Sequence, residues 1–586
     1  MVSSAYTQDF SFKKELKKNH KITYQLFSNK KTSYRLMLDS NASVSERWAA
    51  LELQHWLKEI SGAYFPIDSI NTPYKGPQII IGFNERVKLL TSLKAPDEVD
   101  ESFRYFNDGK DIYIYGGKLR GTMYGVTAFL ENEFGCRWYT PTVSVIPKMN
   151  HYRFSVYQFS DSPKIRIRHN NYWGASDPVW AARNKMNGRQ QYVDQPGGVQ
   201  AYWGVHTFYQ LLPPAEFFDK HPEYYSLVKG KRIYFANTKH EPGQLCLSNE
   251  DVVRIVTERV KERMRKNPEY LVYDVSHNDI WGNHCECNKC LSKSAEYGGE
   301  SGLMIWFVNQ IAAEVKNEFP NKFIGTLAYR YTRNPPVNIS PHKNVVIRLC
   351  PIEACVAHDL ASCPQNQSFM KDLKGWSSIA PHLFIWDYVT NFEAYILPYP
   401  NFNVLKSNIQ TFQKYNSIGI MEQGNYQSPG GEFAELRTYL LSRLLWDPDS
   451  DVDSIVNDFT SNYYGKSSQY ILQYFKFLHS QITAESHIHI GLKAQDSIFS
   501  IEFINQSLVI FEKAKKVAND DEILSRVQLA SLPVLYLKCK RFPRLAFNDG
   551  TYMKFRKIVK QHGITKYSES GETADSFDSF VKGGHN

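Results

Sequence analysis

The spacing of apolar residues over roughly the first 155 positions predicts a small α/β module. A short strand over 34–38 precedes a segment, 49–60, whose apolar residues recur at helical spacing. Ser43 and Glu46 have the spacing of a capping box at the start of that helix, and Gly62 marks its end. Further on, the pattern predicts a buried strand, a hairpin and a second helix, over 78–82, 103–115 and 121–134.

A different pattern runs from about residue 160 to residue 430, where short apolar strands alternate with helices such as 249–265 and 303–319. Such alternation is typical of βα units around a parallel sheet. With one strand missed, it predicts a central (β/α)8 TIM-like barrel. The predicted strands cover 165–171, 202–208, 270–275, 323–329, 345–349, 383–387 and 418–422.

Strands give way to amphipathic helices after about residue 431. The pattern predicts a C-terminal helical region over 431–566 and, because Ser, Asp and Gly dominate the end, a flexible tail over 567–586. The expected fold class is therefore α/β, with an N-terminal module (1–155), a barrel (160–430) and this helical region. The helices are expected over 432–446, 452–464, 468–482 and 501–518.

Composition excludes several classes of protein. The 586 residues are 42% hydrophobic and 22% charged, which is typical of a folded chain and not of a disordered or collagenous one. The net charge of +9 is a small, scattered surplus, so we expect no nucleic-acid partner. We also expect no transmembrane segment, since no run of eighteen apolar residues occurs. Residues 1–10 lack the apolar core of a signal peptide, so the chain is either cytoplasmic or its targeting segment was removed or lies outside this sequence.

Carboxylates follow several of the predicted barrel strands, where the reacting groups of TIM barrels stand. Because strand ends meet at one edge, they could converge among aromatic rings. Two carboxylates among sugar-stacking rings are what cleavage of a glycosidic bond requires. Each carboxylate taken singly could instead pair with a nearby arginine or cap a helix. The candidate catalytic residues are Glu353, Asp279, Glu422 and Asp387.

Polar and aromatic side chains at the same strand ends are candidates for substrate binding. His206 ends a strand and could bind a substrate hydroxyl, although a buried histidine with satisfied hydrogen bonds is an equal alternative. The full set is His206, Asn278, Tyr329, Tyr331, Trp386, Tyr388 and Asn425.

Three closely spaced cysteines, Cys285, Cys287 and Cys290, have the local spacing of metal ligands. The fourth ligand could be His284, Cys246 or one of Cys350, Cys355 and Cys363. The two interpretations are a structural zinc site and reduced thiols that brace a loop. Catalysis itself is expected to need no cofactor, because the strand ends already supply carboxylates.

Long motifs occur in order between about residues 160 and 480, at 206–209, 221–224, 244–249, 276–290, 328–336, 385–392, 422–426 and 444–448. They resemble those of the domain of unknown function 4838, whose characterised members form glycoside hydrolase family 163. The first 150 residues resemble the N-terminal domain shared by α-glucuronidases and β-hexosaminidases, which precedes a TIM barrel.

The resemblance implies an endo-β-N-acetylglucosaminidase that cuts the chitobiose core of N-glycans, in gut Bacteroidetes that forage on host glycoproteins. It also implies export to the periplasm or cell surface and a glycan or glycoprotein partner. If the substrate's 2-acetamido group attacks the anomeric carbon, one carboxylate need only orient it. We expect Glu353 as a partly desolvated general acid/base and Asp279 as the orienting group, with Glu422 and Asp387 as close alternatives. The other two hypotheses are an exo-acting α-glucuronidase or β-hexosaminidase and a non-catalytic glycan-binding protein.

Overall fold

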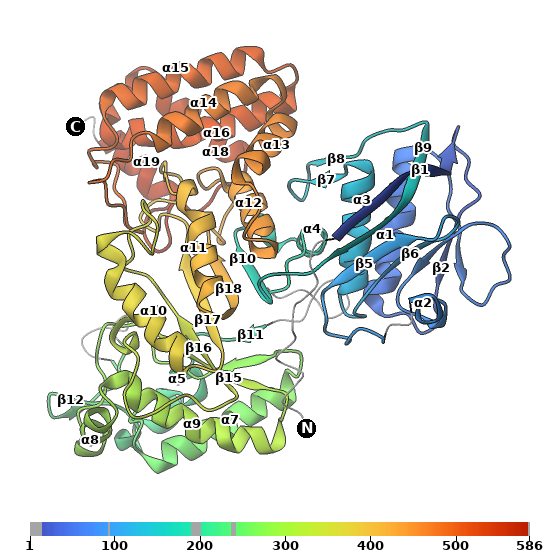
Figure 1. Cartoon of the computed structure of the whole chain (residues 1–586). Helices are drawn as coiled ribbons and strands as arrows, with labels where there is room; N and C mark the ends of the chain where they lie inside the picture. Colours follow the sequence, from blue (N-terminus) through green and yellow to red (C-terminus); the bar gives the residue numbers. More distant parts are fainter. Residues whose placement is uncertain (1–14, 92–93, 189–200, 236–241, 584–586) are drawn as a thin grey trace.

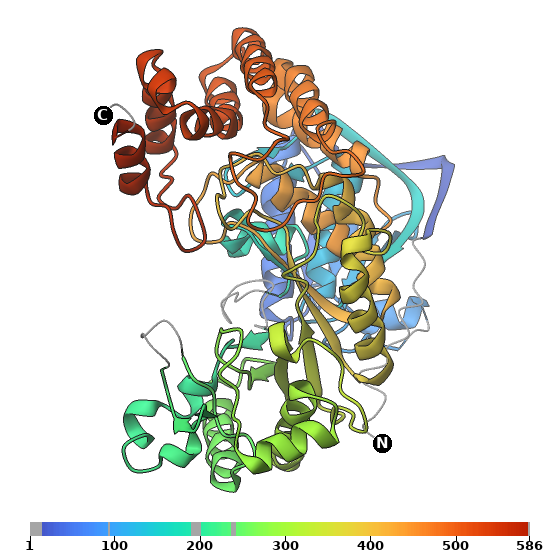
Figure 2. The ribbon, with the colours of Figure 1, turned by 90° about the vertical axis from the view of Figure 1, so that its left-hand side faces the viewer.

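A computed structural model gives the structure of the chain, and it describes residues 15–91, 94–188, 201–235 and 242–583. The expectation about a signal segment therefore concerns residues outside the described part. Figure 1 shows an N-terminal module beside a sheet surrounded by helices, and Figure 2 shows the C-terminal helices gathered at the end of the molecule opposite α7 (Glu250–Lys266) and α9 (Glu300–Glu318).

The N-terminal module is a seven-stranded sheet with the order β1-β9-β5-β6-β4-β2-β3, against which α1 and α3 pack. The predicted capping box is confirmed, because Ser43 and Glu46 exchange hydrogen bonds at the start of α1. The long antiparallel pair β1–β9 was not predicted. The elements are β1 (Glu15–Ser28), β2 (Arg35–Leu38), α1 (Val44–Ser61), β3 (Ile67–Ser69), β4 (Gln78–Ile81), α2 (Glu85–Thr91), β5 (Phe103–Asn107), β6 (Ile112–Gly116), α3 (Gly121–Phe134) and β9 (His151–Asp161).

The central part is a parallel sheet with the order β10-β18-β17-β16-β15-β14-β11. Each of its seven strands overlaps a predicted one, and the TIM-like fold class is confirmed. The strand predicted over 202–208 is wrong in its length, because β11 is only Tyr202–Trp203 and Phe208 begins the helix α5 (Phe208–Leu211). The described residues contain no eighth strand between the edge strands β10 and β11, and 189–200 lie outside the described part. The strands are β10 (Ile167–Asn171), β11 (Tyr202–Trp203), β14 (Val272–Asp274), β15 (Phe323–Ala328), β16 (Val345–Leu349), β17 (Leu383–Tyr388) and β18 (Ser417–Gln423).

Helices α7 and α9, together with α10 (Gln367–Ile379), α11 (Phe402–Lys414) and α12 (Ala434–Trp446), follow or separate these strands. The prediction of a loose tail over 567–586 is wrong for its described part. Phe577 and Val581 of α19 are fully buried, so this segment is packed. The C-terminal helices are α13 (Val452–Tyr464), α14 (Ser468–His479), α15 (Ile501–Val517), α16 (Asp521–Arg541), α17 (Pro543–Asn548), α18 (Thr551–Gln561) and α19 (Ala574–Gly583).

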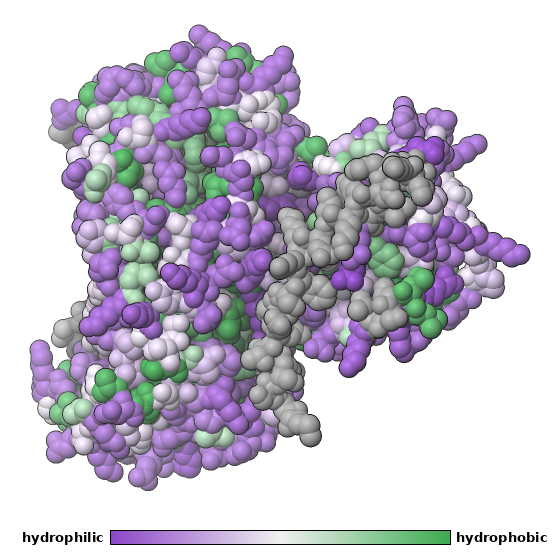
Figure 3. All heavy atoms as spheres, viewed as in Figure 1, coloured by the Kyte–Doolittle hydropathy of each residue, from purple (hydrophilic) through white to green (hydrophobic). Residues whose placement is uncertain are grey.

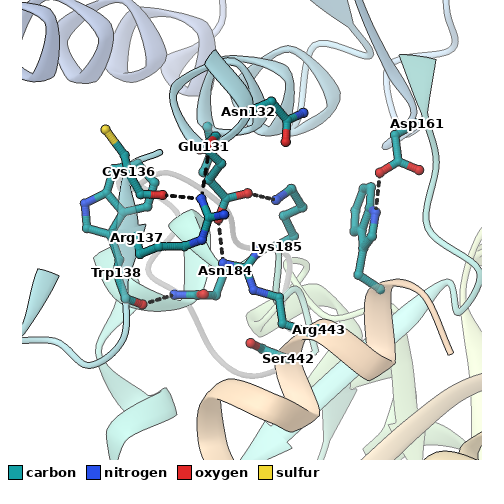
Figure 4. A network of polar contacts seen from close by, with 12 residues as sticks. Glu131, Asn132, Cys136, Arg137, Trp138, Asp161, Asn184, Lys185, Ser442 and Arg443 are labelled. Atoms are coloured by element: carbon teal, nitrogen blue, oxygen red, sulfur yellow. Dashed lines mark hydrogen bonds and ion pairs between the residues drawn. The ribbon is translucent and has the colours of Figure 1, made fainter. Parts of the chain in front are cut away.

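A buried carboxylate holds the N-terminal module to the barrel region. Glu131 of α3 accepts hydrogen bonds from Lys185 at 2.9 Å and from Arg443 of α12 at 2.5 Å (Figure 4). Burial alone would raise the pKa of Glu131, but Arg443 and Lys185 outweigh it and hold the pKa well below its usual range. The carboxylate therefore lies between two cations and offsets part of their charge at the contact.

Glu101 makes a second contact of this kind. Its carboxylate pairs with Arg120 of its own module and with the fully buried Arg168 of β10. Asn187 donates to the same carboxylate at 2.9 Å. Although burial opposes the change, these cations lower the pKa of Glu101 to about 2. The edge strand β10 is thus fixed by a charge from outside the barrel.

The outer surface is largely hydrophilic in the view of Figure 3, with apolar residues in small scattered groups. Among the described residues, none of the helices combines the length and the apolar character that crossing a bilayer requires.

Replacing Glu131 by Gln should destabilise the chain by about 3–5 kcal/mol at neutral pH, because Lys185 and Arg443 would stay buried without a counter-charge. Urea unfolding followed by circular dichroism measures the change. Glu85→Gln, which removes an exposed partner of Lys88, is the matched control and should leave the midpoint unchanged within error. Equal midpoints for Glu131→Gln and the wild type would contradict the expected role of this contact.

Candidate functional site

The alternation of side chains along β17 decides which way its carboxylate points. Phe384 and Trp386 belong to an apolar cluster inside the curved sheet, whereas Ile385 belongs to the large core under the helices. Because successive side chains of a strand point to opposite faces, Asp387 lies on the helix side with Ile385.

Glu422 of β18 lies on the same outer side. It is the registered neighbour of Asp387 on one strand and of Asn170 on the other. Asn170 donates a 2.8 Å hydrogen bond to the carbonyl of Thr438 in α12, which places this register position under the helices. The expectation that four carboxylates meet at one edge of the barrel is therefore wrong for Asp387 and Glu422.

These two acids form a buried pair. Glu422 is 0% and Asp387 is 6% exposed, and neither oxygen of Glu422 has a hydrogen-bond partner among the described residues. Burial raises the pKa of Glu422 well above its usual range, and the neighbouring Asp387 raises it further. Burial also raises the pKa of Asp387, although the N–H of Tyr388 donates to it at 2.9 Å. A protonated carboxyl relieves both the burial and the repulsion.

The other two predicted carboxylates lie in the loops that follow β14 and β16, and both are accessible. Asp279 is 55% exposed and forms an ion pair with Arg330 at 3.1 Å. Glu353 is 38% exposed and forms an ion pair with Arg333 at 2.8 Å. The Glu353 carboxylate is thus accessible and paired with Arg333, and its expected partial desolvation stays a prediction.

Both arginines come from the turn that follows β15, between the two loops. Arg333 is itself fixed, since it also donates to Asp372 of α10 at 2.7 Å and to Ser368 at 2.7 Å. Arg330 has a left-handed backbone, with φ 53°. Strained backbones of this kind concentrate at functional sites. One turn thus holds two carboxylates from the flanking loops.

Aromatic and imidazole rings surround this edge on the inner side. Tyr329 lies with its ring centroid 6.0 Å from that of His206 and 6.1 Å from that of His277. His206 Nδ1 donates to the His277 carbonyl at 2.7 Å, which leaves Nε2 as the acceptor of the neutral ring. Burial lowers the pKa of His206, so the neutral form is favoured. These contacts leave a hydroxyl-binding role open to His206.

Trp386 and Tyr388 continue the inner aromatic surface. Trp386 Nε1 donates to Gln423 at 2.6 Å, and its ring stacks at 6.5 Å on that of Tyr388. Gln423 donates at 3.4 Å to Glu569, a carboxylate from the segment before α19, and Tyr395 donates to Glu569 as well. Sequence reasoning missed Glu569, because nothing local indicates that residue 569 returns to the end of β18.

Three further predicted substrate-binding residues make contacts within the protein. The amide of Asn278 donates to the Gly243 carbonyl at 2.7 Å. The ring centroid of Tyr331 lies 4.8 Å from that of His277, and Tyr331 lines a small hollow together with Cys285. Asn425 is 0% exposed and donates to the Ser428 carbonyl at 2.7 Å. Their side chains brace loops behind the inner surface.

Asp274, at the end of β14, is an inner-face acid that sequence reasoning missed. It is 0% exposed and accepts hydrogen bonds from Ser276 and Thr207. Burial raises its pKa to about 7 in spite of Arg348, whose guanidinium lies 3.5 Å from the ring centroid of Tyr202 inside the barrel. Val272 points into the barrel, so the alternation of side chains along β14 predicts that Asp274 points inward as well. Its burial places it in the core beneath the accessible pair.

Cys246 lies beside the three closely spaced cysteines, Cys285, Cys287 and Cys290, and is the fourth member of their cluster. The sulfurs of Cys246, Cys285, Cys287 and Cys290 all lie within 4.8 Å of one another. Cys246 Sγ is 3.6 Å from Cys287 Sγ and 3.8 Å from Cys290 Sγ, and four thiolates around zinc stand ~3.8 Å apart when each Zn–S bond is ~2.3 Å. The N–H of Leu227 also donates to Cys285 Sγ. The four sulfurs fit a tetrahedral zinc ion, and His284 is not among them.

A cavity of about 950 Å³ lies between the loop at Tyr139, the segment at Trp173 and α16. Neither Asp279 nor Glu353 lines it. It therefore lies apart from the accessible carboxylates.

The sequence matches the family model for DUF4838, a domain of unknown function, over residues 138–476, which is more than half of the chain. The chain belongs to this family. None of the curated proteins matches the sequence.

Two solved structures share the fold of this DUF4838 protein. One is a family GH115 4-O-methyl-α-glucuronidase, BtGH115A, with specificity for decorated arabinogalactans. Its sequence is 14% identical, the match covers 92% of this chain and 77% of that chain, and the TM-score is 0.55. The other is CpGH84D, 10% identical, with 97% of each chain covered and a TM-score of 0.51.

Replacing Asp387 by Asn should stabilise the protein at pH 8 by roughly 1–3 kcal/mol, because the amide keeps the Tyr388 contact and removes a buried charge. A raised carboxyl pKa contributes stability that is present below the unfolded pKa of ~4 and is lost as the pH rises through the folded value. The gain should therefore vanish near pH 4. Melting temperatures of the two proteins from pH 4 to pH 8 test this, and a constant difference would contradict it.

Proposed function

We propose that this chain is a glycoside hydrolase whose reaction takes place between the loops that follow β14, β15 and β16. One observation carries the proposal: Asp279 and Glu353 are the predicted carboxylates that remain accessible at the carboxyl edge of the barrel sheet, and each is held by an arginine beside the inner aromatic rings. Such an edge is where TIM barrels carry out their chemistry, and two carboxylates are what glycosidic cleavage needs. The shared fold of BtGH115A, a glucuronidase by its name, supports the same class.

Within this proposal, Glu353 transfers the proton to and from the glycosidic oxygen, and Asp279 faces the anomeric carbon or the substrate's 2-acetamido group. Substrate contact has to displace Arg333 or share it, because the arginine occupies one side of the Glu353 carboxylate. Trp386 and Tyr388 offer ring faces for the apolar face of a sugar. Asp387 and Glu422 have no part in the reaction, since they lie on the helix side of the sheet.

For the substrate, we infer an N-glycan cut at its chitobiose core, which makes the chain an endo-β-N-acetylglucosaminidase. The sequence motifs shared with glycoside hydrolase family 163 support this inference, and several of them lie in the loops just described. The same resemblance supports a protein that is exported and meets glycoproteins outside the cytoplasm.

A second candidate is an exo-acting α-glucuronidase. Arg330 and Arg333 stand side by side on one turn, and arginine binds carboxylates in two-point contacts, so a uronic acid would find its partner here. The fold shared with BtGH115A favours this candidate.

Mass spectrometry of the products separates the two candidates from a non-catalytic glycan-binding protein. The endo-acting enzyme should release whole glycans from an N-glycoprotein and leave one N-acetylglucosamine on each asparagine. Release of glucuronic acid alone would favour the second candidate. Glycan binding without turnover, unchanged when Asp279 or Glu353 is replaced, would contradict both enzymatic candidates.

Glu353→Gln should lower glycan release by roughly 10²–10⁴-fold, because the amide cannot transfer a proton. Binding of the glycan should change little, and an activated aryl glycoside, whose leaving group needs little protonation, should lose much less activity. Glu422→Gln is the matched control, since it makes the same chemical change on the outer face. An active Glu353→Gln variant beside an inactive Glu422→Gln or Asp387→Asn variant would show that the proton belongs to the other strands.

We also propose that the four sulfurs of Cys246, Cys285, Cys287 and Cys290 hold a structural zinc ion. All four positions around the ion are filled by protein, so the site offers no open position for a reacting water. The Arg232 guanidinium lies 3.6 Å from Cys285 Sγ, so a positive charge faces the sulfurs that would bind the ion.

Cys287→Ser should lower the zinc content of the purified protein by about one ion per chain and lower its melting temperature. Elemental analysis and calorimetry measure the two effects. Cys539→Ser, at a buried cysteine of α16 outside the cluster, is the control and should keep the metal. Unchanged zinc content in Cys287→Ser would contradict the proposal.

A further inference from the structure

A second group of metal-ligand side chains lies where the loop after β16 meets the loop between α14 and α15. It consists of Cys355, His358 and Cys363 from the first loop and His487 from the second, 124 residues further along the chain than Cys363. One ligand atom from each lies within 4.8 Å of the other three. The two cysteines are buried and the two histidines are half-buried.

The distances within this group are those of a tetrahedral site. His487 Nδ1 is 3.4 Å from Cys355 Sγ and 3.7 Å from Cys363 Sγ, and His358 Nδ1 is 3.8 Å from Cys355 Sγ. With Zn–S near 2.3 Å and Zn–N near 2.05 Å, a tetrahedron sets sulfur and nitrogen ~3.6 Å apart. The three distances are thus close to those that one tetrahedral ion would set between its ligand atoms.

The contacts behind these side chains select the ligand atom. His358 Nε2 lies 3.0 Å from the Thr483 carbonyl, and because a carbonyl only accepts, Nε2 carries the proton. The lone pair of the neutral ring is then on Nδ1, which faces Cys355 Sγ. Metal-bound histidines characteristically donate their other N–H to a carbonyl in this way.

The backbone around Cys355 is equally fixed. Asn366 accepts from the N–H of Cys355 at 2.7 Å and donates to its carbonyl at 2.9 Å. The next residue, Val356, donates its N–H to the carbonyl of Ile488, beside His487, at 2.8 Å. The ligands from the two loops are therefore positioned by contacts other than those among themselves.

From this arrangement we propose that Cys355, His358, Cys363 and His487 bind a second structural zinc ion. Two thiolates and two imidazoles in a tetrahedron are a ligand set that zinc favours, and all four positions are filled by protein. The ion would join the β16 loop to the C-terminal helical region. Glu353 lies two residues before Cys355, and His489 donates to the Glu353 carbonyl at 3.2 Å. The proposed ion site therefore lies next to the residue that carries the accessible carboxylate.

The test compares two substitutions of the same kind in the same loop of the full chain. His487→Phe removes a ligand and keeps a planar ring, and the protein should hold about one zinc ion fewer than the wild type by native mass spectrometry. His489→Phe, two residues away and outside the cluster, should hold as many ions as the wild type. Equal zinc content in His487→Phe and the wild type would overturn the proposal.

A second measurement covers the case in which His487→Phe does not fold. In the variant Cys246→Ser/Cys287→Ser the first cluster is disabled, so added Co²⁺ should give the visible bands of a tetrahedral ion with thiolate-to-cobalt charge transfer. Absence of those bands would overturn the proposal. So would a disulfide between Cys355 and Cys363, shown by two fewer free thiols in the denatured wild type, since all nine cysteines are free thiols in the structure.

Discussion

The two-residue period of a β-strand is the constraint on which the candidate site depends. Every side chain of a barrel strand is committed either to the interior or to the helices, and a shift of one position exchanges the two. Phe384 and Trp386 occupy the interior, which commits Asp387 to the helix side, and the parallel register carries Glu422 with it. Carboxylates in the loops beyond the strands are not subject to this alternation. Asp279 and Glu353 therefore reach solvent, whereas acids within the strands are buried.

Sequence alone predicted all seven barrel strands, because an apolar run bounded by turns needs no knowledge of distant residues. It did not predict which face of each strand is the interior, since buried strands are apolar on both faces. For that reason Asp387 and Glu422 were wrongly assigned to the barrel edge, and Asp274 was missed. Elements that depend on distant partners were missed as well. The β1–β9 pair, Glu569 at the end of β18 and the packed helix α19 have no local signal.

Buried charge decides how the parts of the chain are held together. Glu101 and Glu131 each bring a carboxylate from the N-terminal module into contact with cations from the barrel region, and each carboxylate remains ionised despite burial. Glu422 shows the opposite case, because no cation among the described residues pairs with it and burial favours its protonated form. Paired charges thus fix the module against β10 and α12, while burial and the neighbouring Asp387 favour the neutral form of Glu422.

The two accessible carboxylates share a further property of their surroundings. Each lies in a loop that also carries a cluster of potential metal ligands: Cys285 follows Asp279 by six residues, and Cys355 follows Glu353 by two. Long loops at a barrel edge lose conformational entropy when a reaction requires a fixed geometry. A bound ion in each loop would fix its backbone, and Arg330 and Arg333, from the turn between the loops, hold the two carboxylates directly. The accessible acids are therefore exposed to solvent and yet held by ion pairs at the side chain, and the proposed ions would hold the backbone of the loops behind them.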